Sequence, residues 1–173
     1  MKVEQQQQIL TCMTQVLNQN GFRAELMQNE NAPLLLRCEA MRQGKVAKDV
    51  VFEICFIPMP LPHEDEGLLQ FFVTLFQGVP EQNAMQLRRA CGYCNDFCAL
   101  GSFGFFPQAG QLFLKHNTLL DGTLELEKNV GLIADNISVL LASVSRFIDG
   151  LASVGFSGMP LEAVVDQELF PKM

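Results

Sequence analysis

The pattern of apolar residues along this 173-residue chain predicts an α+β fold. Apolar side chains recur at helical spacing near the start, in the middle and towards the end of the sequence. Between these segments, apolar and polar residues alternate as they do in half-buried strands. Tight turns join most of the strands, and strands joined in this way are antiparallel. The sequence therefore predicts one antiparallel sheet of about five to six strands with helices packed against it.

The first helix is predicted over residues 6–20, because apolar side chains fall on one face of that segment. The residues of this face are Ile9, Leu10, Met13, Val16 and Leu17. An Asn-Gly pair ends the helix, since both residues tolerate the left-handed conformation of a helix terminus. Two strands follow at residues 22–26 and 34–41, each with one charged face, and a turn is expected between them at residues 29–32.

The next two strands, at residues 50–57 and 68–76, are predicted to be apolar on both faces. Alternation in the first strand sets Phe52, Ile54 and Phe56 against Val51, Cys55 and Ile57. In the second strand, Phe71, Val73 and Leu75 likewise oppose Phe72 and Phe76. A strand that is apolar on both faces needs cover on both faces. Helices on one face would leave the other face to the C-terminal tail, a second subunit or a protein partner.

A second helix is predicted over residues 81–99, after a Gly-Val-Pro segment that ends the preceding strand. Two short strands at 102–106 and 111–116 follow, joined by a hairpin turn. The last element is a long amphipathic helix over 123–154, in which Gly131 predicts some local irregularity. No linker divides the chain, so we expect a single domain over residues 1–158 and a tail over 159–173.

The composition favours a folded, acidic, intracellular protein. Half of the residues (49%) are hydrophobic, 18% are charged and the formal net charge is −7. An acidic surface repels phosphate groups, so we expect neither nucleic acid nor a membrane surface as a partner. The N-terminal residues lack the features of a signal peptide, and no apolar stretch reaches the ~20 residues of a membrane span. These observations predict a cytoplasmic location, where the six cysteines stay reduced.

The closely spaced cysteines Cys91, Cys94 and Cys98 form the strongest candidate for a metal or redox site, because thiolates a few residues apart can bind zinc or an iron–sulfur cluster. Together with Leu87 they also follow the spacing of the buried stripe of the second helix. Cysteine packs as a small hydrophobe in such a position. We therefore expect core cysteines and no metal, with a metal site or a redox pair as the alternatives.

Catalytic motifs are missing from the sequence. No nucleophile elbow, zinc-protease helix, phosphate-binding loop or dinucleotide fingerprint is present. With His63 and His116 as its two histidines, the chain offers little material for a histidine-based triad. The residues His63 to Glu66 are expected to form a solvated hairpin tip instead of a cation site. The sequence predicts no catalytic residues and no cofactor, although carboxylate pairs distant in sequence stay open.

Three segments carry a resemblance to a known family: Tyr93-Cys94-Asn95-Asp96-Phe97, Gly101-Ser102-Phe103-Gly104-Phe105 and Gln111-Leu112-Phe113-Leu114. With the order of elements and the closing helix, they resemble the type III secretion chaperone-like fold, and within it the bacterial sensory-transduction-regulator (YbjN-type) family. The resemblance implies a small acidic protein, often a homodimer, without catalytic residues. Secretion chaperones of this fold hold an extended segment of an effector protein against an apolar surface.

The predicted function is therefore non-enzymatic protein binding, chaperone-like or regulatory, by a homodimer with an unidentified protein partner. The candidate partner-binding residues are Val51, Ile57, Phe72 and Phe76. Extended-peptide recognition at such a surface would use main-chain bonds at an open strand edge and pockets for alternate side chains. The alternatives are that these side chains fill a core or a dimer interface, that a small-molecule sensor holds its ligand between the sheet and the final helix, or that the chain is a hydrolase.

Overall fold

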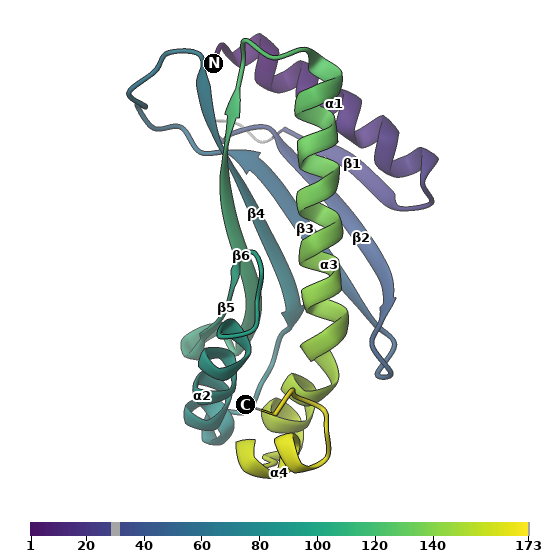
Figure 1. The fold of residues 1–173 in the computed structure, drawn as a ribbon, viewed down its shortest axis with the longest axis vertical. Helices are drawn as coiled ribbons and strands as arrows, with labels where there is room; N and C mark the ends of the chain where they lie inside the picture. Colours follow the sequence, from purple (N-terminus) through teal and green to yellow (C-terminus); the bar gives the residue numbers. More distant parts are fainter. Residues whose placement is uncertain (29–31, 173) are drawn as a thin grey trace.

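The computed structural model describes residues 1–28 and 32–172 and confirms the α+β fold (Figure 1). Most of the turn predicted at residues 29–32 lies outside these ranges. Six strands form one antiparallel sheet in the order β1-β2-β3-β4-β6-β5. The strands are β1 (Arg23–Met27), β2 (Leu35–Gln43), β3 (Lys48–Phe56), β4 (Glu66–Phe76), β5 (Ser102–Phe106) and β6 (Gln111–Asp121). The two longest strands, β4 and β6, are neighbours, and β6 also pairs with the edge strand β5.

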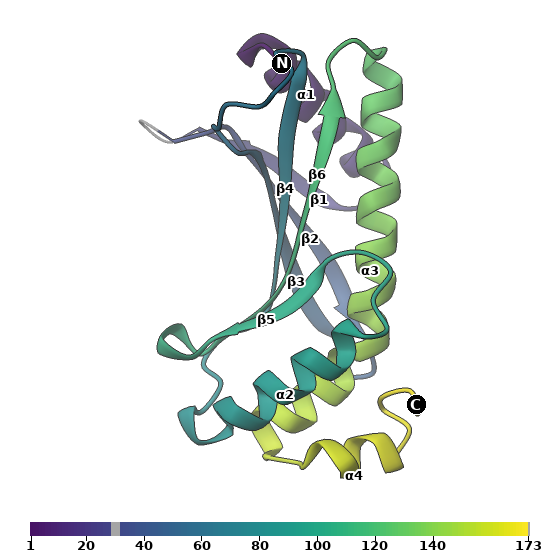
Figure 2. The ribbon, with the colours of Figure 1, turned by 60° about the vertical axis from the view of Figure 1, so that its left-hand side comes forward.

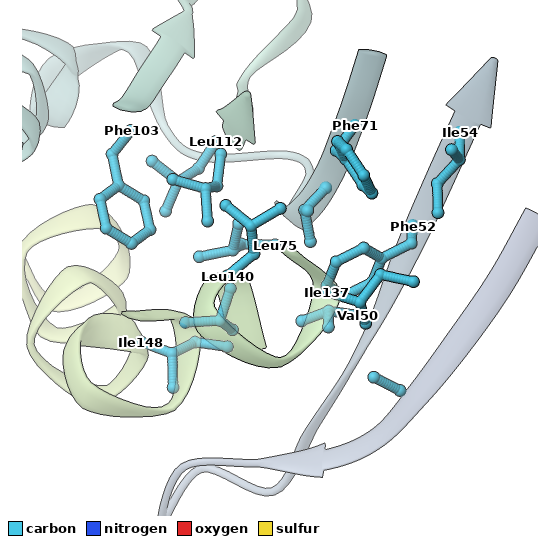
Figure 3. Packing of buried hydrophobic residues seen from close by; sticks show 14 of the residues in the cluster. Val50, Phe52, Ile54, Phe71, Leu75, Phe103, Leu112, Ile137, Leu140 and Ile148 are labelled. Atoms are coloured by element: carbon cyan, nitrogen blue, oxygen red, sulfur yellow. The ribbon is translucent and has the colours of Figure 1, made fainter. Parts of the chain in front are cut away.

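Three helices pack against one face of the sheet (Figure 2). They are α1 (Val3–Gln19), α2 (Ala84–Asn95) and α3 (Leu126–Ser157), and α3 runs along the length of that face. Apolar side chains fill the space between the sheet and α3, where Ile137, Leu140 and Ile148 of the helix join the strand residues Phe52 and Phe71 (Figure 3). Each of these side chains is at most 4% exposed, and burial of one such group contributes about 1.5–3 kcal/mol.

Two helix ends differ from the prediction. A short 3₁₀ turn (Glu81–Asn83) precedes the middle helix α2, which ends at Asn95. The α-helix is therefore shorter than predicted, and Cys98 lies beyond its end. The final helix extends to Ser157, because Gly155 lies inside the helix and Gly158, with a φ of 65°, supplies the left-handed terminus. The irregularity expected at Gly131 does not occur, since α3 is continuous through that residue.

The C-terminal tail packs on the helices and not on the second face of the sheet. It contains the short helix α4 (Leu161–Asp166), which lies beside α2 and α3 (Figure 2). Phe170 is 2% exposed, and its ring lies 6.0 Å from the rings of both Phe147 and Tyr93. The hydroxyl of Tyr93 donates a hydrogen bond of 2.5 Å to the carbonyl oxygen of Pro171. The part of the tail that the structure describes therefore leaves the second face uncovered.

By its length and composition, the helix α3 could cross a membrane, since its most apolar 18-residue segment has a mean hydropathy of 1.5. The sequence-based expectation concerned unbroken apolar stretches, and polar or charged residues such as Asp135, Asn136 and Arg146 interrupt α3. Half of that segment is buried inside the protein. The stripe of α3 that includes Ile133, Leu140 and Val144 forms part of the core, so we interpret α3 as a core helix.

Candidate functional site

The face of the sheet that points away from the helices is the candidate site, and it is called the uncovered face below. In β4, buried residues on the helix side alternate with half-buried residues on the uncovered face. The structure places three of the four predicted binding residues, Val51, Ile57 and Phe72, on this face. Val51 and Phe72 lie near its centre, and Ile57 continues the alternation of β3 at one end. Phe76 differs, because it follows the register shift after Thr74 and pairs with buried Leu112 of β6. Its ring packs against Phe156 of α3, with the ring centroids 5.3 Å apart.

A cluster of three stacked aromatic rings lies beside the centre of the uncovered face. The rings of Phe72 and Phe113 are 4.9 Å apart, and those of Phe113 and Phe106 are 4.4 Å apart. Gly104 makes this stacking possible, since a Cβ atom at that position would lie 2.4 Å from the ring of Phe113. Phe106 is 48% exposed. An exposed aromatic cluster on a half-buried strand surface is suited to contact with another protein.

The uncovered face also carries charges that the sequence-based description of two apolar faces omitted. Glu53 lies on this face of β3, between Arg37 of β2 and Phe72 of β4. Lys115 of β6 lies on the other side of Phe72. A shallow depression of about 440 Å³, lined by residues that include Val51, Glu53 and Phe76, opens on this part of the face. The surface therefore combines aromatic and aliphatic side chains with charges of both signs, a mixture that protein interfaces also show.

In each edge strand, the backbone N–H and C=O of the second residue are hydrogen-bonded to an asparagine side chain. At the β1 edge, the Asn18 amide donates to the carbonyl of Ala24 at 2.9 Å and accepts from its N–H at 3.0 Å. At the β5 edge, Asn95 makes the same pair of bonds to Phe103, at 3.1 and 2.7 Å. An added strand needs these outward N–H and C=O groups. The two asparagines therefore disfavour recognition by strand addition at these points and direct association to the uncovered face.

Replacing Asn95 by alanine is expected to destabilise the chain and to make the β5 edge available. The N–H and C=O of Phe103 would lose their partners, which costs about 1–3 kcal/mol for partly buried groups. Chemical denaturation measures this loss, and thioflavin binding over time measures edge-to-edge association. Asn136→Ala is the matched control, because the Asn136 amide bonds to the carbonyl of Leu132 within α3, on the exposed side of that helix. Equal behaviour of the two variants would contradict the role of Asn95.

The six cysteines are free thiols, and three of them, Cys38, Cys91 and Cys94, are buried. Cys91 and Cys94 are buried in α2 as predicted, whereas Cys98 lies beyond the helix end and is half-buried. Cys55 alternates with buried Ile54 and lies on the uncovered face, the side on which the sequence set it with Val51 and Ile57. Burial raises the pKa of the Cys38 and Cys91 thiols to about 12 and also raises that of Cys94.

No group of three or more His, Cys, Asp or Glu side chains that could hold a metal ion occurs within residues 1–28 and 32–172. The absence of a structural metal stays a prediction. Elemental analysis of protein purified without chelators is expected to find far less than one zinc or iron per chain. A stoichiometric metal that is lost together with folding in Cys91→Ser would contradict the assignment of Cys91 and Cys94 to the core.

Thiol labelling provides a second measurement on the same residues. The thiolate is the reacting species, so the raised pKa values of Cys38, Cys91 and Cys94 lower their reaction rates at about pH 8. We expect these three to label slowly in the native protein and rapidly in denaturant. Rapid labelling of Cys94 in the native protein, followed by peptide mapping, would show that α2 does not pack as described.

Two exposed carboxyl groups in the described part of the chain have shifted pKa values. Hydrogen bonds from the backbone and hydroxyl of Thr123 lower the pKa of Asp121. A bond from its own backbone amide, and then Arg89, lower the pKa of Glu162. A general acid needs the opposite shift. His63 lies in an exposed loop, and His116 stacks on the Phe71 ring at 5.9 Å. The expectation of no catalytic residues stays a prediction.

No protein-family model matches the chain, and a search of curated proteins finds no significant relative. The resemblance to the YbjN-type family and to secretion chaperones therefore stays a prediction.

Proposed function

We propose that this chain is a non-enzymatic protein-binding module, chaperone-like or regulatory, that acts in the cytoplasm. Its binding surface is the uncovered face of the sheet, and the aromatic cluster of Phe72, Phe106 and Phe113 is the main contact. The partner is a protein surface or segment with an apolar centre and charges of both signs around it. The observation that carries the proposal is a half-buried aromatic cluster on a sheet face that neither the helices nor the described tail covers.

The extent of the exposed surface supports this proposal. The chain has a mass of 19.3 kDa and an accessible surface of 9410 Å², whereas a compact monomer of that mass exposes about 8,500 Å². The chain is therefore more exposed than an average monomer of its mass, as expected for a sheet with one uncovered face. A ligand site between the sheet and α3 has less support, because buried side chains such as Leu140 and Phe52 fill that space.

Affinity purification of the tagged chain from its native host tests the proposal. The wild type is expected to retain a protein partner that Phe106→Asp loses, because a carboxylate would disrupt the aromatic cluster. Phe106 is 48% exposed, so the substitution should not impair folding. Met85→Asp is the matched control, since Met85 is a 76% exposed apolar residue on α2, away from the uncovered face. Retention of the same partner by Phe106→Asp would count against the uncovered face as the binding surface.

A further inference from the structure

We infer that the uncovered face binds the same face of a second copy of this chain, with the two-fold axis running along β4. This inference rests on the proposed function, because it takes the uncovered face as the binding surface. It adds the identity of one occupant, the direction of the symmetry axis and the residues that meet across it.

The strand register arranges the uncovered face in rows that cross β3, β4 and β6. Each row has one residue from each of these strands, with the residue of β4 in the middle. The central rows are Val51–Thr74–Phe113, Glu53–Phe72–Lys115 and Cys55–Gln70–Asn117. One further row, Ile57–Leu68–Leu119, follows at the end of the sheet where the Ile57 N–H donates to the Leu68 carbonyl.

A two-fold axis along β4 places β3 of one chain opposite β6 of the other, row by row. In the rows of Val51, Glu53 and Ile57, the residues that meet are then matched in chemistry. Val51 meets Phe113, Glu53 meets Lys115, Cys55 meets Asn117 and Ile57 meets Leu119 of the second copy. Residues of β4 meet themselves, with Phe72 opposite Phe72. Each contact occurs twice, as in any isologous interface. The face is therefore complementary to itself about this axis.

The other in-plane axis, perpendicular to the strands, does not give this match. Centred on Phe72, it would place Glu53 opposite Glu53 and Lys115 opposite Lys115 of the second copy. Like charges that face each other across an interface cost several kcal/mol. The positions of Glu53 and Lys115 on opposite sides of Phe72 thus select the axis along β4.

The geometry of sheets is compatible with this arrangement. Aligned sheets pack about 10 Å apart with their strands rotated by roughly 30°, a separation that Glu and Lys side chains span from both sides. The asparagine bonds at Ala24 and Phe103 disfavour the alternative of edge-to-edge pairing.

A charge-swap experiment tests this axis. In Glu53→Lys or Lys115→Glu, each dimer would contain two like-charge contacts, so we expect the dissociation constant to rise by at least about 100-fold. A mixture of the two variants restores both contacts. In the mixed dimer, the lysine introduced at position 53 of one chain meets the glutamate introduced at position 115 of the other, and the native Lys115 of the first chain meets the native Glu53 of the second. Light scattering and analytical ultracentrifugation measure the masses, and circular dichroism confirms that each variant is folded.

Glu25→Lys is the matched control. Glu25 lies on the same face and neighbours Arg37 as Glu53 does, but β1 has no counterpart across the two-fold axis. This variant is expected to dimerise like the wild type. If Glu53→Lys does not fold, Leu119→Asp replaces it, since Leu119 is 53% exposed in the single chain and would meet Ile57 of the second copy.

The expected result is a wild-type dimer of twice 19.3 kDa, two monomeric single variants and a dimer in their mixture. A wild-type monomer at tens of micromolar would overturn the inference, and so would single variants that stay dimeric. If the wild type is monomeric but captures a protein partner that only Phe106→Asp loses, the dimer inference fails and the proposed function stands. If Phe106→Asp and the charge variants change neither capture nor mass, both proposals fail.

Discussion

Replacing Phe71 by alanine is expected to destabilise the fold by about 3–5 kcal/mol, whereas the same change at Phe72 is expected to cost only about 1–2 kcal/mol. The two residues are neighbours in β4 and differ in the face they occupy. Phe71 is fully buried against the helices, so its removal leaves a cavity. Phe72 is half-buried, and its replacement removes two ring contacts, one with Phe113 and one with Phe106.

Urea denaturation of the monomeric protein at low concentration measures both changes, and binding assays with the folded variants complete the comparison. Phe72→Ala should weaken association while its melting temperature falls much less than that of the Phe71 variant. A Phe72 variant that melts as early as the Phe71 variant, and associates normally when folded, would show that Phe72 belongs to the core of a single chain.

Gly150→Ala is expected to destabilise the protein by about 1–3 kcal/mol and to release the C-terminal tail. A Cβ atom at Gly150 would lie 2.4 Å from the ring of Phe170, which is buried against Phe147 and Tyr93. The ring would have to leave its site, and the segment after α4 would move with it. Limited proteolysis followed by mass spectrometry should then show cleavage after residue 158 that the wild type resists.

Gly131→Ala in the same helix is the control for helix propensity. Nothing lies within 4 Å of a Cβ atom at Gly131, so alanine should stabilise α3 by up to about 1 kcal/mol. Opposite signs for the two substitutions would support the docking of Phe170. If Gly150→Ala were as stable as the wild type and equally resistant to protease, the tail would not be held by Phe170, and it would again be a candidate cover for the second face.

The alternation of β3 and β4 allowed the faces of the sheet to be predicted from the sequence. A period of two separates Val51 from Phe52, and Phe71 from Phe72, whichever strands pair with them. Element boundaries were less certain where a distant contact decides them. The middle helix ends at Asn95, whose side chain forms hydrogen bonds with the backbone of Phe103. No pattern in the neighbouring sequence predicts these hydrogen bonds.

The composition of the candidate site depended on strand order, which the sequence did not provide. Phe113 and Lys115 border Phe72 because β6, and not β5, is the neighbour of β4. Gly104 was the available signal, since a glycine inside a strand often marks a close approach by a neighbouring side chain, here the ring of Phe113. Glu53 was visible in the sequence, and its alternation with Phe52 and Ile54 was sufficient to place it on the uncovered face.

Site-specific photocrosslinking measures most directly whether the uncovered face binds protein. A photoreactive benzoylphenylalanine at position 72 is compared, in cells of the native host, with the same residue at position 85 on the exposed side of α2. Crosslinks from position 72 to a second copy or to another protein, with none from position 85, are the predicted result. Crosslinks that form only at position 85, or a position 72 that reacts with no protein, would contradict the assignment of the uncovered face as the binding surface.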